Sequence, residues 1–144
     1  MVNFYVDSSV ILRVLRGQKD AWKGWGNWGK AYSSTLIRVE CRRFIDRMRL
    51  EHNWTDDDIA NAGIQLRRLE RVITKARLTP AIMERAAAPM PTIVKTLDAI
   101  HIATASLIRE RFQPDLIFVT HDQQQARAAL ALGFDCADVA LSTL

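Results

Sequence analysis

Apolar positions along the chain fall either into short continuous runs or into stripes with helical spacing. Residues 2–6 form a short apolar run that predicts a first strand, and this strand ends at Asp7. The run over residues 116–119 is apolar at every position, as expected for a strand that is covered on both faces. Weaker patterns predict further strands at 31–33, 77–79 and 136–140.

Between these runs, apolar residues recur every three or four positions, which predicts helices. The helix over 97–111 is apolar on most sides, so we expect it to be deeply buried. Residues 18–30 contain three glycines and three tryptophans and predict a short helix or a loop. The remaining helices are predicted between Asp7 and Gly17, after Ser34 or Thr35, over about 56–73, from Pro80, and over 123–132.

Strands that are separated by helices indicate βα units and a parallel sheet. We therefore predict one domain over residues 1–144, an α/β fold built as a three-layer α/β/α sandwich with a mostly parallel central sheet. Ligand sites in such folds lie at the carboxyl ends of the strands. Asp7 and Asp122 each follow a predicted strand directly, which places both at that edge.

Composition narrows the classes of function. The chain has 144 residues and a formal net charge of +4 with a pI of about 9.4, which is compatible with a polyanionic partner. It has neither a long apolar span for a membrane nor the basic start and cleavage site of a signal peptide, so we expect a cytoplasmic protein. The first strand is followed by Asp-Ser-Ser-Val, so the glycine patterns of dinucleotide-binding and P-loop enzymes are absent there.

Most of the sixteen acidic residues lie in first helical turns, in loops or on solvated helix faces, but four interrupt apolar patterns. A carboxylate at the edge of a core is costly unless a partner compensates its charge, and few basic residues share these inward faces. A divalent cation such as Mg²⁺ or Mn²⁺, which prefers hard oxygen ligands, explains all of them together. The four are Asp7, Glu40, Asp98 and Asp122.

Taken singly, three of these acids have a structural alternative. Asp7 and Asp122 can each cap the helix that follows, and Asp98 can be a first-turn acid that suits the helix dipole. Glu40 is harder to explain in this way, because acids on apolar faces in the middle of a helix are uncommon. The joint occurrence of the four acids in a predicted parallel sheet favours the metal site.

The order of these segments resembles the PIN domain, and most closely the VapC toxin branch of that family. The likeness rests on an apolar strand that ends in Asp-Ser-Ser (7–9), a helix that bears Glu40, and Val119-Thr120-His121-Asp122 before an alanine-rich helix. Its most specific segment is Leu-Asp-Ala-Ile-His-Ile-Ala-Thr-Ala (97–105). The family often has Thr where this chain has Ser8, which is a mild departure.

The resemblance implies a PIN-like fold and a metal-dependent endoribonuclease, with Mg²⁺ or Mn²⁺ bound by Asp7, Glu40, Asp98 and Asp122 and supported by Ser9 and Thr120. It further implies an RNA substrate, a homodimer and a cognate antitoxin protein that holds the toxin inactive. Two alternatives stay open: a PIN nuclease outside any toxin pair that acts on RNA or structured DNA, and a non-catalytic scaffold of the same fold.

Three further groups of residues have two interpretations each. Arg13, Arg38, Arg42 and Arg43 are candidate contacts to RNA phosphates, or they lie on solvated helix faces. His101, one turn beyond Asp98, is either a catalytic group or a structural hydrogen-bonding group, and we favour the second. Trp22, Trp25 and Trp28 either pack against the core or an interface, which we favour, or stack on unpaired RNA bases.

Overall fold

The computed structural model describes residues 1–138. Within these residues, five strands form one sheet in the order β3-β2-β1-β4-β5, and every pair of neighbours is parallel. This confirms the predicted α/β fold and places β1 at the centre of the sheet. The strands are β1 (Phe4–Val6), β2 (Ala31–Ser34), β3 (Thr74–Ala76), β4 (Ile117–Val119) and β5 (Asp135–Ala137).

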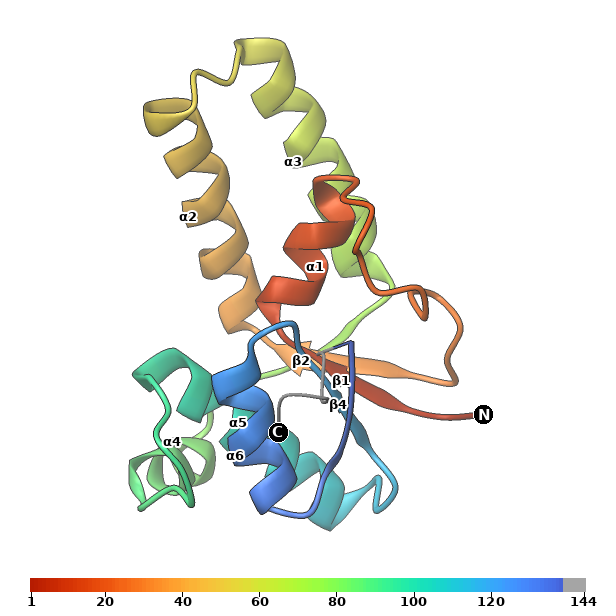
Figure 1. The fold of residues 1–144 in the computed structure, drawn as a ribbon, viewed down its shortest axis with the longest axis vertical. Helices are drawn as coiled ribbons and strands as arrows, with labels where there is room; N and C mark the ends of the chain where they lie inside the picture. The colour runs from red at the N-terminus through yellow and green to blue at the C-terminus, as the bar shows by residue number, and fades with distance from the viewer. Residues whose placement is uncertain (139–144) are drawn as a thin grey trace.

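The helices connect these strands and cover the sheet. Two of them, α2 and α3, extend well beyond the sheet as a long pair, with α1 between their lower halves (Figure 1). No helix among residues 1–138 is long and apolar enough to cross a membrane. The helices are α1 (Ser8–Leu15), α2 (Leu36–Glu51), α3 (Asp56–Arg71), α4 (Pro80–Ala87), α5 (Thr96–Arg111) and α6 (Gln123–Ala131).

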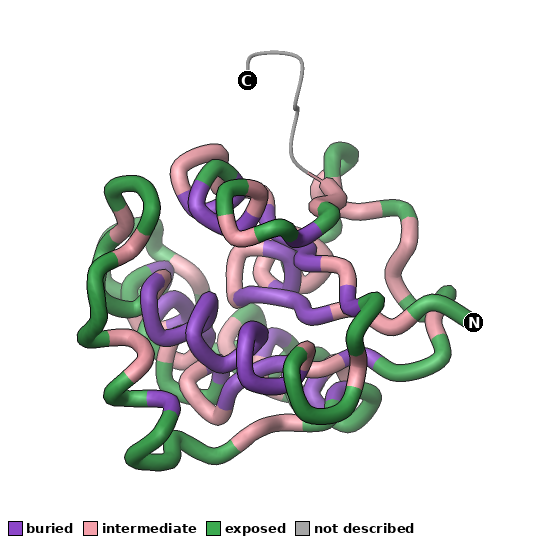
Figure 2. The backbone as a smooth tube through the Cα atoms, turned by 90° about the horizontal axis from the view of Figure 1, so that it is seen from below, coloured by how far each residue is buried: buried purple, intermediate pink, exposed green. Residues whose placement is uncertain are grey.

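Alternation along the central strands divides the core into two sides. Val6 and Val119 pack with apolar residues of α1, α2 and α3. Tyr5 and Phe118 point to the other face and pack with residues of α5 and α6. Helix α5 is buried from Ala99 through Ile108, as its all-round apolar pattern predicted, and this stretch is drawn purple in Figure 2. The result is a three-layer sandwich.

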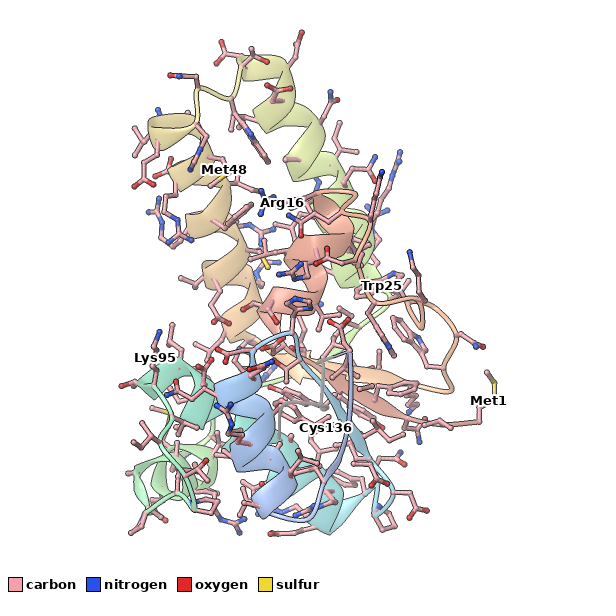
Figure 3. The ribbon with its side chains drawn as sticks, in the orientation of Figure 1. Met1, Arg16, Trp25, Met48, Lys95 and Cys136 are labelled. Carbon is pink, nitrogen blue, oxygen red and sulfur yellow. The ribbon has the colours of Figure 1, made fainter. Side chains whose placement is uncertain are left out.

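The tryptophan-rich segment between α1 and β2 is an irregular loop rather than a helix. Its three tryptophans pack against the α1–α3 side of the core. Trp22 meets Phe4 edge to face with ring centroids 4.8 Å apart. Trp25, which is labelled in Figure 3, meets Trp28 in the same way at 5.1 Å. This agrees with the packing role favoured from the sequence.

The prediction of a third strand at residues 77–79 was wrong, because β3 lies three residues earlier. Ile73, next to β3, is buried in the core, whereas Leu78 is 39% exposed. Thr79 serves as the cap of α4, and its hydroxyl accepts a hydrogen bond from the backbone N–H of Ile82 at 3.3 Å. The last strand was predicted at 136–140, but it covers Asp135–Ala137; positions 139–140 lie outside the described residues.

A buried carboxylate joins the two long helices. Glu70 on α3 is only 4% exposed, and it accepts hydrogen bonds from Arg42 at 2.6 Å and from Arg38 at 3.3 Å, both on α2. The backbone carbonyl of Glu70 also accepts from Lys75 at 3.1 Å. The carboxylate is buried and the guanidiniums are partly exposed. Loss of the arginines would therefore leave an unpaired buried charge, whereas the arginines without Glu70 could be solvated by water.

We expect Glu70→Gln to lower the free energy of unfolding by about 1–2 kcal/mol, since a charge-assisted pair becomes a neutral contact in a buried place. Glu110→Gln is the matched control, because Glu110 pairs with Arg85 on the exposed surface; there we expect less than about 0.5 kcal/mol. Urea denaturation of both variants measures the difference. Equal effects at the two positions would contradict the structural role of Glu70.

Candidate active site

Asp7 lies where β1 ends and is 3% exposed. It caps α1 and accepts the backbone N–H of Val10 at 3.4 Å. The same oxygen, Oδ1, accepts a hydrogen bond from the hydroxyl of Ser9 at 2.6 Å, and Oδ2 accepts one from Thr120 at 2.9 Å. Asp7 can therefore cap α1 and also belong to the site, so these two interpretations of Asp7 do not exclude each other. Both hydroxyl residues singled out in the sequence bind this one carboxylate.

Asp122 caps α6 at the end of the neighbouring strand β4. Its Oδ1 accepts the backbone N–H groups of Gln124 at 2.8 Å and Gln125 at 3.3 Å. Its own backbone N–H donates to the Thr120 hydroxyl at 3.1 Å. Since Thr120 also binds Asp7, one hydroxyl joins the two acids at the carboxyl edge of the sheet.

Glu40 and Asp98 approach the same place from two helices. Glu40, in the second turn of α2, accepts a hydrogen bond on Oε1 from His101 Nε2 at 2.6 Å and a longer one on Oε2 from Ser8 at 3.3 Å. Asp98 lies in the first turn of α5. An open pocket of about 560 Å³ is lined by all four predicted acids, together with Ser8, Ser9, Leu12, Lys95, Thr96 and Leu97. The structure thus brings the four acids together.

Burial, more than mutual repulsion, raises the pKa values of two of these acids. Removal from water raises the pKa of Asp7 from its ordinary 3.8 to about 6, against the lowering influence of His101, Ser9 and Thr120. Burial also raises the pKa of Asp98, and the negative charge of Asp122 raises it further. For Asp98, the repulsion from Asp122 is therefore the smaller of these two causes.

A family comparison matches this arrangement. The family model of the PIN domain matches residues 4–130, from β1 into α6, and so includes the four acids. The chain belongs to the PIN domain family. PIN domains are typically nucleases, and they generally use divalent metals.

Among solved structures, this PIN domain is similar to the crystal structure of PAE2754 from Pyrobaculum aerophilum. The TM-score is 0.56 with 17% sequence identity, over 94% of this chain and 83% of that chain. At this identity the likeness shows a shared fold alone. No curated protein matches the chain in sequence.

The donor set of the pocket fits a hard divalent cation, because it is made of carboxylate and hydroxyl oxygens. Among residues 1–138, no group of three or more His, Cys, Asp or Glu side chains is arranged to hold a metal ion. Mg²⁺ usually keeps several waters and takes only one or two carboxylates from a protein. A cation in this pocket would therefore be held partly through water.

The four arginines proposed as phosphate contacts all have carboxylate partners. Arg38 and Arg42 bind the buried Glu70, as described above. The other two ion pairs join Arg13 to Asp20 and Arg43 to Asp46. The pairs to Glu70 could not be predicted from the sequence, because they depend on how α2 packs against α3. Their role in binding RNA stays a prediction.

Sequence reasoning missed Tyr5 and Gln125. The Tyr5 hydroxyl lies 2.7 Å from His101 Nδ1, and Gln125 lies 2.8 Å from Thr120, so each contacts a partner of a pocket acid. Both are fully buried. A signal was present in each case, because a polar group within an apolar strand or on the inner face of a helix needs a hydrogen-bonding partner. His101 was singled out, and its hydrogen bonds agree with the structural role that the sequence favoured.

Asp7 makes the stability of the metal-free protein depend on pH. Because its pKa is higher in the folded chain than in the unfolded chain, folding binds a proton between these values. The favourable contribution is complete below about pH 4 and is lost as the pH rises through about 6. A shift of this size corresponds to about 3 kcal/mol.

We therefore expect Asp7→Asn to become more stable relative to wild type as the pH rises, by about 2–3 kcal/mol between pH 4 and pH 7. The measurement is urea denaturation of both proteins in excess chelator at several pH values. Acids that lie far from Asp7 titrate equally in the two proteins, so their contributions cancel in the difference. If the difference in free energy of unfolding between Asp7→Asn and wild type is the same at pH 4 and at pH 7, the pKa of Asp7 is not raised by burial.

Proposed function

We propose that this PIN domain is a Mg²⁺- or Mn²⁺-dependent endoribonuclease and that it acts as the toxin of a toxin–antitoxin pair. The observation that carries the proposal is the pocket at the carboxyl edge of the sheet, where Asp7, Glu40, Asp98 and Asp122 meet. The net charge of +4 is compatible with an RNA substrate. The VapC-like order of motifs supports the toxin role.

The reaction is hydrolysis of a phosphodiester bond: a water oxygen bonds to phosphorus, the bond to the leaving oxygen breaks, and that oxygen takes up a proton. A bound divalent cation would supply a more acidic water and neutralise charge on the phosphate. Asp7, Asp98 and Asp122 would hold this cation, directly or through water. Glu40 would accept a hydrogen bond from the attacking water and orient it towards phosphorus.

Two features of the protein prepare these acids for that role. Ser9 and Thr120 each donate to Asp7, so both of its carboxylate oxygens have fixed directions. Asp122 is fixed by the first backbone N–H groups of α6. Acids that are held in place before binding lose less conformational freedom when the cation arrives.

We expect Asp98→Asn to lower cleavage of single-stranded RNA by about two orders of magnitude or more, since a metal-binding oxygen is lost. In chelator the variant should be as stable as wild type or more stable, because the carboxylate is charged in a partly buried place beside Asp122. Cleavage in Mn²⁺ and thermal melting in chelator measure the two effects. Asp115→Asn is the matched control, because Asp115 is exposed and lies outside this pocket.

Several outcomes would count against the nuclease proposal. Undiminished cleavage in excess chelator would show that the reaction does not need a metal. An Asp98→Asn protein that unfolds would show that Asp98 has a structural role. Cleavage of structured DNA in preference to RNA would favour a nuclease of another class. Absence of cleavage in any metal would favour a binding scaffold.

We expect expression of the chain alone to arrest bacterial growth, because a free endoribonuclease degrades RNA that the cell needs. Asp7→Asn should abolish the arrest, and co-expression of a small protein from the adjacent reading frame should relieve it. Growth curves with induced and uninduced genes provide the measurement. If Asp7→Asn remains as toxic as wild type, the toxicity does not come from this site.

A further inference from the structure

A buried hydrogen-bonded chain leads from the centre of the sheet to Glu40. The Tyr5 hydroxyl lies 2.7 Å from Nδ1 of His101, and Nε2 of His101 lies 2.6 Å from Oε1 of Glu40. Tyr5 is 0% exposed and His101 is 1% exposed. These hydrogen bonds thus join β1, α5 and α2, three elements that are far apart in sequence.

The chemistry of the three groups sets the direction of these bonds. An ionised carboxylate only accepts, so His101 must donate from Nε2–H when Glu40 carries its charge. Nδ1 of the neutral imidazole is then an acceptor, and the Tyr5 O–H is the donor placed to satisfy it. Burial raises the pKa of Tyr5 well above its ordinary value, so this hydroxyl keeps its proton.

Tyr5 and His101, the two members of this series that lie away from the pocket, are held in place by packing. The Tyr5 ring stacks on Phe118 with centroids 5.4 Å apart and planes 16° apart, and it meets the His101 ring edge to face at 5.9 Å. His101 lies in the fully buried stretch of α5. By contrast, the hydrogen bond that the Glu40 carboxylate accepts from Ser8 is long, at 3.3 Å. The direction of the Glu40 carboxylate therefore depends mainly on His101.

We propose that His101 is a positioning residue: its Nε2–H, held by the Tyr5 hydroxyl on the opposite nitrogen, fixes the Glu40 carboxylate in the pocket. This inference rests on the proposed nuclease function, in which Glu40 orients the attacking water. His101 does not touch the reacting atoms. It acts on cleavage only through Glu40, and Tyr5 acts only through His101.

Two substitutions of His101 separate the two ring nitrogens. A glutamine amide reaches about as far as Nε2 and can still donate to Glu40, whereas an asparagine amide reaches only about as far as Nδ1. We expect His101→Asn to lower the single-turnover rate by about 10–100-fold, as is typical when a group that orients a ligand is lost. His101→Gln should keep most of the rate. Arg85→Gln, on the exposed surface of α4, serves as a control with an unchanged rate.

A double-mutant cycle tests whether His101 acts through Glu40. In a Glu40→Gln background, His101→Asn should cause little further loss of rate, whereas a general effect on folding would lower the rate again. If Glu40→Gln cleaves as fast as wild type, both the proposed role of Glu40 and this inference fail. If Glu40→Gln is slow and His101→Asn is as fast as wild type, only this inference fails.

Nitrogen NMR of the imidazole provides a test that needs no activity. In the metal-free wild-type protein, at a pH at which the ring is neutral, we expect Nε2 of His101 to carry the proton and Nδ1 to accept a hydrogen bond. Tyr5→Phe should then shift the Nδ1 resonance and leave the fold intact, because only a hydroxyl is removed. A proton on Nδ1 with none on Nε2 would overturn the proposal.

Discussion

The burial of the Asp7 carboxylate is the constraint on which the site depends. The side chain is almost completely removed from water at the end of the central strand, which raises its pKa to about 6. The protein offsets this cost with hydrogen bonds from Ser9, Thr120 and the start of α1. Thr120 in turn contacts Asp122, so the geometry around one costly acid also orients its neighbour.

The fold follows from the sequence wherever an element has one dominant pattern. Helix α5 was predicted within one residue at its start, because its apolar residues surround the whole helix. The strand β3 was misplaced because Arg77-Leu78-Thr79 has the local character of a strand, while Thr79 is used as a helix cap and Thr74–Ala76 pairs with β2. Both segments have only weak strand patterns, and pairing with β2 determines which of them forms the strand. Periodicity along the sequence does not show such pairing.

The site was predictable to the extent that its residues break a pattern. Glu40 stood out because an acid on an apolar helical stripe needs a partner, and the structure gives it His101. The identity of that partner could not be predicted, since Glu40 and His101 are 61 positions apart and meet only through packing of α2 near α5. The same holds for Arg38 and Arg42, whose partner Glu70 lies on the next helix. Residue types thus indicate that a polar group needs compensation, and tertiary structure decides what provides it.

The proposed function requires that the pocket lined by the four acids binds a divalent cation. Anomalous X-ray diffraction from crystals soaked in Mn²⁺ tests it most directly, because the signal locates manganese without reference to activity. We expect a manganese peak inside the pocket lined by Asp7, Glu40, Asp98 and Asp122. Manganese bound elsewhere on the protein, with none in this pocket at saturating concentration, would contradict it.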